Sequence, residues 1–224
     1  MSYPINYPTP QGANVQIFQA PNRSGANNGV TWVKPQGASF VWFTLIGCGG
    51  RGDGTTGGGS GSVTNFMCPA FLIPDVLTVR VGQENVSTTQ IIYTGKDSSP
   101  NTYQLLSTNS GTGSIGGAAV AANFFTAMGF YQSVAGASGT TGSVSASGTT
   151  FLSGGGAFST TQASNYGYSS GPANTDRDGF FQMQPIIVGT GGMGGVPATG
   201  GIGCGGGQVN GSKGGNGLVV IITW

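Results

Sequence analysis

The chain of 224 residues contains no histidine, and only 6% of its residues are charged. Without histidine, Ser–His or Cys–His activation of a nucleophile is excluded. Glutamate occurs once, as Glu84, and the aspartates are scattered or lie in predicted turns, so no pair of catalytic carboxylates is visible. The formal net charge of +1 provides no basic surface for nucleic acid. These absences predict a protein that is not an enzyme, needs no cofactor and does not bind nucleic acid.

Cysteine is also scarce, and the three that occur, Cys48, Cys68 and Cys204, form an odd set with no CxxC spacing. A disulfide framework usually has an even number of cysteines, and a zinc site usually needs histidine or paired cysteines. We therefore expect buried free thiols. Asp176 and Asp178 weakly resemble a calcium loop, but the further acidic ligands are missing, so no metal site is predicted.

Long hydrophobic runs are absent as well. The longest, such as residues 218–222, are far shorter than a membrane span. The first residues lack the basic and apolar regions of a signal peptide. We expect no membrane insertion. The chain is expected to fold where it is made, or to leave the cell by a non-standard route such as release by lysis inside a virus particle.

Short runs of β-branched and aromatic residues, separated by turn-forming residues, dominate the chain. Phe40–Ile46 and residues 218–224 are apolar on both alternating faces, so both are predicted to be strands buried on two sides and paired with each other. Residues 75–82 alternate and should bury one face, whereas residues 118–128 are the best helix candidate. Further strands are predicted at residues 14–18, on both sides of a turn at residues 35–37, and at residues 89–95. The pattern predicts an all-β, sandwich or jelly-roll-like body.

The domain organisation follows from composition. Residues 1–14 contain two Tyr–Pro pairs, which favour an extended N-terminal arm that lies over a partner subunit. Residues 15–224 are predicted to form one glycine-rich β domain. The residues of the arm that should make the assembly contact are Tyr3, Pro4, Tyr7 and Pro8.

Glycine is the residue present in excess, at 45 of 224 residues against a usual share of about 7%. In residues 189–207, small residues recur at every third position, which is the period of the polyproline-type extended helix. Such helices can pack side by side with backbone hydrogen bonds between them if their residues are small; the alternative is a set of flexible loops. In the packed form, Met193, Val196 and Ile202 should project along one edge toward core or a second subunit. We call a set of residues spaced three apart a lane, because its members lie on one side of such a helix. The lane predicted to face neighbouring backbone contains Gly189, Gly192, Gly195, Gly201 and Gly207.

Aromatic residues are concentrated in the centre of the chain. Tyr166 and Tyr168 lie among serine, glycine and asparagine, the composition of binding loops. Together with Phe180 and Phe181 they are the predicted contacts to a receptor or partner. The adjacent Phe pairs, Phe124–Phe125 and Phe180–Phe181, are expected to be buried in a core or in an interface. An RGD tripeptide at residues 51–53 is a weak signal, because three-residue matches are frequent by chance.

Four motifs occur in a characteristic order: "WVKPQG" at residues 32–37, "IGCGGRGDGTTGGGSGS" at residues 46–62, "LTVRVG" at residues 77–82 and "GGNGLVVIITW" at residues 214–224. This order resembles the glycine-rich domain of viral fibre proteins, such as the tail-fibre adhesins of tailed bacteriophages. The resemblance covers the two ends of the chain and leaves out a central region of about residues 83–188. It implies a virion structural protein, often receptor-binding, sometimes with packed polyglycine helices.

We therefore predict a fibre, spike or adhesin component on the virion surface that contributes to particle assembly. Its expected partners are other virion proteins, copies of itself with a trimer favoured, and a host-surface glycan or protein. Two alternatives stay open. One is a minor capsid protein of the vertex, penton or cement kind, which would need its capsid to assemble. The other is a secreted glycine-rich surface or matrix protein, against which the missing signal peptide counts.

Overall fold

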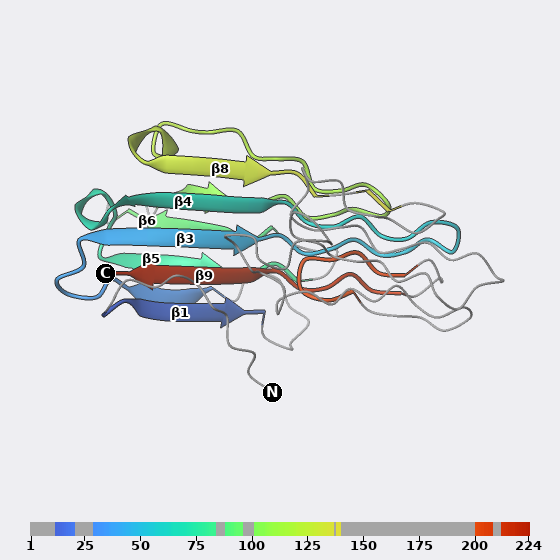
Figure 1. Cartoon of the computed structure of the whole chain (residues 1–224), viewed down its shortest axis with the longest axis horizontal. Helices are drawn as coiled ribbons and strands as arrows, with labels where there is room; N and C mark the ends of the chain where they lie inside the picture. Colours follow the sequence, from blue (N-terminus) through green and yellow to red (C-terminus); the bar gives the residue numbers. More distant parts are fainter. Residues whose placement is uncertain are drawn as a thin grey trace.

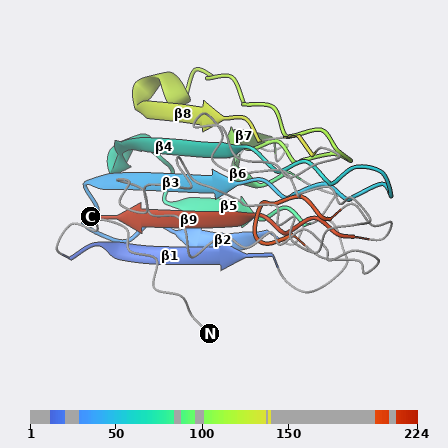
Figure 2. The ribbon, with the colours of Figure 1, turned by 45° about the vertical axis from the view of Figure 1, so that its right-hand side comes forward.

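In the part of the chain that the structure describes, the strands form two antiparallel sheets that lie face to face (Figures 1 and 2). The structure is a computed structural model that describes residues 12–20, 29–83, 88–95, 101–136, 138–139, 200–207 and 212–224. The first sheet has the strand order β1-β9-β3-β4-β8, and the second has the order β2-β5-β6-β7. The strands are β1 (Asn14–Gln19), β2 (Val30–Val33), β3 (Phe40–Ile46), β4 (Val63–Pro69), β5 (Val76–Arg80), β6 (Gln90–Thr94), β7 (Thr102–Ser107), β8 (Phe130–Val134) and β9 (Leu218–Thr223).

The predicted pairing of the two strands with apolar residues on both faces is confirmed. In the first sheet, β9 lies between β1 and β3 and pairs antiparallel with both. In the register with β3, Val41 is opposite Thr223 and Ile46 is opposite Leu218. The all-β, sandwich-like body predicted from the sequence is therefore correct. Of the predicted arm, the structure describes only residues 12–14, and Asn14 already pairs with Thr223 in β1.

The main core lies between the two sheets. Trp32 of β2 is fully buried and its ring meets Phe43 of β3 edge to face, with ring centroids 6.1 Å apart. Leu77 and Val79 supply the buried face of β5, as the alternation of residues 75–82 predicts. Trp32, Leu77 and Val79, which belong to two of the sequence motifs, are thus core residues in this fold.

A second apolar cluster covers the outer face of the first sheet. Burying both faces of one sheet explains why β3 and β9 lack the alternation of a half-exposed strand. The predicted two-sided burial is correct for both. The buried members of the cluster are Ile46, Val63, Cys204, Leu218, Val220 and Ile222.

The helix predicted at residues 118–128 is wrong. Only the short 3₁₀ turn η2 (Thr126–Met128) forms there, because side chains bind the backbone groups that a helix would pair. Asn123 Oδ1 accepts a hydrogen bond from the Thr126 N–H (2.9 Å), and Thr126 Oγ1 accepts one from the Asn123 N–H (2.7 Å). The Val120 carbonyl accepts a hydrogen bond from the Tyr131 hydroxyl (2.7 Å). These bonds hold the segment along β8.

Candidate functional site: a glycine-rich bundle

Glycine-rich segments extend from one end of the sandwich, beyond β3, β4, β8 and β9 (Figure 1). We call these segments the glycine-rich bundle. A buried threonine joins the bundle to both sheets, because Thr89 Oγ1 donates to the Ile46 carbonyl at the end of β3 (2.9 Å) and accepts from the Gly82 N–H beyond β5 (3.0 Å). The Gly217 N–H then donates to the Gly82 carbonyl (2.8 Å). The described parts of the bundle are residues 47–62, 109–117, 135–136, 138–139, 200–207 and 212–217.

The first two segments of the bundle pair with a spacing of three residues. The Gly47 N–H donates to the Ser62 carbonyl (2.9 Å), and the Gly50 N–H donates to the Gly59 carbonyl (2.8 Å). The donor number rises by three while the acceptor number falls by three, whereas antiparallel β-strands repeat every two residues. This is the period that the sequence predicts for the glycine tracts.

Residues 58–62 show that the bundle is not a sheet. The N–H groups of Gly58 and Gly61 donate to residues 206 and 203, each at 2.8 Å. Those of Gly59 and Ser62 donate to residues 113 and 109, at 2.8 and 2.9 Å. The carbonyls of Gly59 and Ser62 accept from residues 47–50. A strand bonds to two neighbours in one plane, but this segment bonds to three neighbouring segments. The predicted packing of extended glycine-rich segments is confirmed for the described residues.

Close backbone contact explains why the residues are glycine. A Cβ at Gly49, Gly58 or Gly61 would lie less than 3.0 Å from a backbone atom of a neighbouring segment. The same holds for Gly139 and Gly215. Real Cβ atoms do not come so close to other heavy atoms, so any larger residue must push segments apart and break the amide pairing.

The tract at residues 189–207 departs from the predicted continuous helix. Gly189, Gly192 and Gly195 lie outside the described residues. The described end contains a turn, in which the Cys204 N–H donates to the Gly201 carbonyl (2.9 Å) and Gly203 has φ 72°. A positive φ suits glycine at this turn position, so the three-residue lane is interrupted before it reaches Gly207, which is buried.

Ile202 sits in this turn and packs against the outer apolar cluster of the first sheet. Its predicted projection toward core is confirmed. The turn therefore attaches the bundle to the sandwich through a side chain as well as through backbone hydrogen bonds.

The loop at residues 51–56 is exposed apart from Gly52 and the half-buried Thr56, and it carries the RGD tripeptide. The carboxylate of Asp53 accepts hydrogen bonds from the backbone N–H groups of Thr56 (2.7 Å) and Thr55 (2.8 Å). It also accepts from both threonine hydroxyls, each at 2.8 Å. These bonds hold the pKa of Asp53 well below its usual value, with the Thr56 N–H the largest cause. Asp53 thus shapes the loop, because both of its carboxylate oxygens bind within it.

No protein-family model matches the chain, and no curated protein is significantly similar to it.

Side chains suited to catalysis or metal binding are few in the part of the chain that the structure describes. No three His, Cys, Asp or Glu residues gather there into a metal site. Cys48, Cys68 and Cys204 are buried thiols, as predicted. Burial raises the pKa of the Cys68 thiol to about 11, against a smaller opposing effect of Lys34, so this thiol is protonated at neutral pH.

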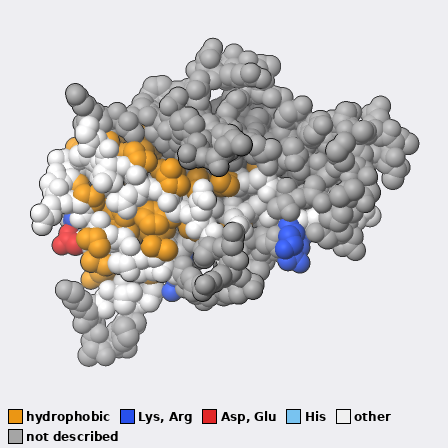
Figure 3. Space-filling view, turned by 90° about the horizontal axis from the view of Figure 1, so that it is seen from below, with side chains coloured by type: hydrophobic (Ala, Val, Ile, Leu, Met, Phe, Trp, Pro, Cys, Tyr) orange, Lys and Arg blue, Asp and Glu red, His pale blue; other side chains and the backbone are white. Residues whose placement is uncertain are grey.

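On the face that Figure 3 shows, the described residues are mostly uncharged. Within the described ranges, no helix is long and apolar enough to cross a bilayer. The predicted contact residues Tyr166, Tyr168, Phe180 and Phe181 lie outside the described residues. So do the arm residues Tyr3, Pro4, Tyr7 and Pro8.

The expected burial of the Phe124–Phe125 pair is only half right. Phe125 packs on Phe66 with ring centroids 5.0 Å apart, whereas Phe124 is 87% exposed. Phe71 is 82% exposed and was not singled out from the sequence. The nearest sequence signal for Phe71 is its place between a Cys–Pro–Ala segment and an Ile–Pro–Asp turn, which marks a loop but does not show which way the ring points.

Proposed function

We propose that the chain is a structural component of a virus particle, of the fibre, spike or adhesin kind. The sandwich would serve as its base and the glycine-rich bundle as a stiff projection. The observation that carries this proposal is the bonding of residues 58–62 to three neighbouring segments. Such bonding makes a firm rod from residues that would otherwise be flexible, which suits a mechanical role. The order of the motifs, which resembles viral fibre domains, supports the same assignment.

The far end of the bundle is where host contact would take place. Residues 51–56 connect two of its segments, and the Asp53 hydrogen bonds fix their conformation. A loop held in one conformation on a stiff support loses little entropy on binding. We assign this loop the role of a contact to a host-surface glycan or protein.

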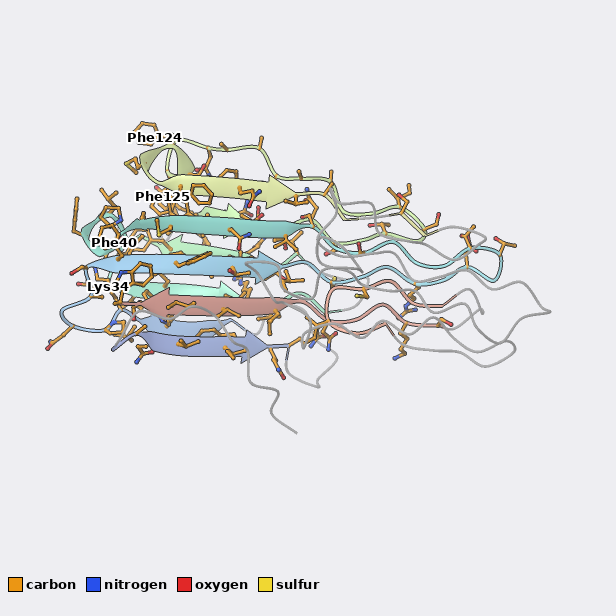
Figure 4. All side chains as sticks on the ribbon, viewed as in Figure 1. Lys34, Phe40, Phe124 and Phe125 are labelled. Carbon is orange, nitrogen blue, oxygen red and sulfur yellow. The ribbon has the colours of Figure 1, made fainter. Side chains whose placement is uncertain are left out.

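A second candidate is a minor capsid protein that stabilises the shell. One observation favours it: large apolar side chains, among them Phe40 and Phe124, are exposed at the end of the sandwich away from the bundle (Figure 4). A shell protein needs such a surface to dock on its neighbours. A fibre component needs one as well, at its attachment point, so this end alone does not separate the two.

Immunogold electron microscopy of purified particles, with an antibody raised against this chain, tests the proposal. Label that projects beyond the shell supports a fibre or spike, and label at the shell surface supports the minor capsid protein. The matched control is an antibody against the shell protein itself. Absence of label from intact and from disrupted particles would reject both candidates.

A further inference from the structure

Two phenylalanines are almost fully exposed at the end of the sandwich away from the glycine-rich bundle. Phe71 lies in the 3₁₀ turn η1 (Ala70–Leu72), and Phe124 lies just before η2. Their exposed fractions are 82% and 87%. Phe124 points away from the body in Figure 4, whereas Phe125 turns toward the sheet. Phe40 is exposed at the same end, and several exposed apolar side chains at one end of a protein indicate an interaction surface. We call this surface the phenylalanine end.

Hydrogen bonds fix the backbone beside Phe124. Asn123 and Thr126 bind each other's backbone N–H groups through their side chains. Phe125 is anchored on Phe66 in the core. The turn thus holds one ring inside and presents the next ring to solvent, and an aromatic ring presented in this way loses little entropy when it is bound.

Phe71 is held in a similar way by a different residue. Lys34 Nζ donates to the carbonyls of Ala70 and Ile73, each at 3.0 Å, on the two sides of Phe71. The same ammonium pairs with Asp75 at 2.8 Å, so the charges at this end neutralise each other. Ala70 points into the core, and the neighbouring Phe71 is left outside.

A hollow lies close to Phe71 in the chain. Its volume is about 480 Å³, large enough for an aromatic side chain. Val76, which is 52% exposed, and Pro74 give it apolar walls. Its one charged residue is Asp75, which is paired with Lys34. The lining residues are Pro74, Asp75, Val76, Thr78, Tyr93 and Thr94.

We propose that the phenylalanine end binds a second copy of this chain, with Phe71 of one copy seated in the hollow of the other and Phe124 packed beside it. A projecting ring and a hollow with apolar walls at Pro74 and Val76 are the two halves of a self-association contact. Because the charges present are already paired, two copies can meet without repulsion between like charges. The projection and the hollow are separate, so the contact can close as a two-fold pair or as a three-fold ring.

The available area agrees with a reversible contact. Each phenylalanine contributes on the order of 150–250 Å² when buried, so two from each copy supply roughly half of a standard interface of about 1,600 Å². Exposed apolar neighbours at the same end supply more. These neighbours are Val33, Phe40, Val76, Met128 and Phe130.

Sedimentation velocity of the full chain over a wide range of concentration tests the proposal. We expect reversible association for the natural sequence, and an assembly at least about tenfold weaker when Phe71→Ser and Phe124→Ser are combined. The matched control is Ile115→Ser, which changes a residue that is 68% exposed in the bundle and should leave association unchanged. Circular dichroism and thermal melting of each variant verify that it is folded.

A second variant tests the hollow without touching either phenylalanine. Val76→Trp fills the hollow and should weaken association to a similar extent. A chain that stays monomeric at every concentration overturns the proposal, as does a double variant that associates like the natural sequence. A third outcome also overturns the proposal. If the natural sequence does not self-associate but binds phosphatidylcholine vesicles, and the double variant does not bind them, the phenylalanine end contacts a lipid surface instead. The inference rests on this surface alone and holds whether or not the chain belongs to a virus particle.

Discussion

At the residue scale, the glycines of the bundle are required for two different reasons. Gly203 needs the positive φ of its turn. Gly61 has no such need, but the space that a Cβ would occupy holds the backbone of Gly47 and Cys48. The second reason is the more demanding, because strain in a turn affects one residue, whereas separated segments lose hydrogen bonds at several.

Gly61→Ala should therefore destabilise the protein strongly. The new Cβ displaces Gly47, so the Gly47 N–H, which donates to the Ser62 carbonyl at 2.9 Å, loses its partner. Each buried polar group left unpaired costs about 1–3 kcal/mol, so we expect a loss of roughly 2–4 kcal/mol in the free energy of unfolding. Urea titrations followed by tryptophan fluorescence measure it.

The matched control for this substitution is Gly37→Ala. Gly37 has φ 80° and nothing near its Cβ position, so this change tests conformational strain alone. We expect a cost of about 1 kcal/mol. Equal losses for the two variants would contradict the close packing of the bundle.

The Cys68 thiol should make stability depend on pH in the alkaline range. Burial raises its pKa from an ordinary value near 9 to about 11, so the folded state holds the proton more tightly than the unfolded state does. The stabilising contribution is complete below pH 9 and is lost as pH rises toward 11, with a total on the order of 2 kcal/mol.

Cys68→Ala removes the thiol and should flatten this part of the profile. The substitution leaves a small cavity, but the cost of that cavity is the same at every pH and does not affect the slope. Urea midpoints at several alkaline pH values measure the difference. If stability falls with pH as steeply in the variant as in the natural sequence, the loss of stability comes from other groups. One such group is Tyr131, because burial raises its pKa as well.

At the element scale, strands with a clear pattern could be predicted and those stabilised by specific polar contacts could not. β3 and β9 are apolar on both faces, and this pattern indicated both their burial and their pairing. β4 was missed because Thr64 and Asn65 interrupt its apolar run. In the structure, Asn65 Oδ1 accepts a hydrogen bond from the buried Thr44 hydroxyl at 2.9 Å, a contact that no local pattern reveals.

The candidate site was predictable to a similar degree. The three-residue spacing of glycine indicated packed segments, because the spacing is a local property of the sequence. Which segments bond to each other depends on how the whole chain folds, and the turn at Gly203 could not be distinguished from the helix by glycine content alone. The outward direction of Phe124 depends on the Asn123–Thr126 hydrogen bonds, which a list of aromatic residues does not contain.

The turn η1 should depend on Lys34. Lys34→Met removes the hydrogen bonds to the Ala70 and Ile73 carbonyls but keeps much of the packing of the side-chain stem. We expect a loss of about 1–3 kcal/mol in the free energy of unfolding.

The comparison variant is Asp75→Asn. The Asp75 side chain is largely exposed, and exposed ion pairs contribute about 0–1 kcal/mol, so this change should cost less than Lys34→Met. Thermal or urea unfolding of both variants gives the order. If Asp75→Asn proved the more damaging, the ion pair rather than the carbonyl contacts would be what holds the turn.

At the scale of the whole molecule, the sandwich and the bundle share their segments. β3 continues into residues 47–50, residues 58–62 continue into β4, and residues 212–217 continue into β9. Thr89 ties the two sheets together where the bundle begins. Because each bundle segment extends a strand of the sandwich or bonds to one that does, the bundle should unfold with the sandwich and not before it.

Amide hydrogen exchange tests this cooperativity. If the bundle and the sandwich open together, the amides of Gly58, Gly61 and Gly215 should exchange only by global unfolding, with protection within about tenfold of that in β3. The amide of Gly37, in an exposed turn of the sandwich, is the internal control and should exchange fast. Glycine-rich sequence by itself predicts the opposite, because glycine is the most flexible residue in isolation. Bundle amides as fast as Gly37 beside a protected β3 would mean that the glycine segments open independently, and a stiff projection could not then be built from them.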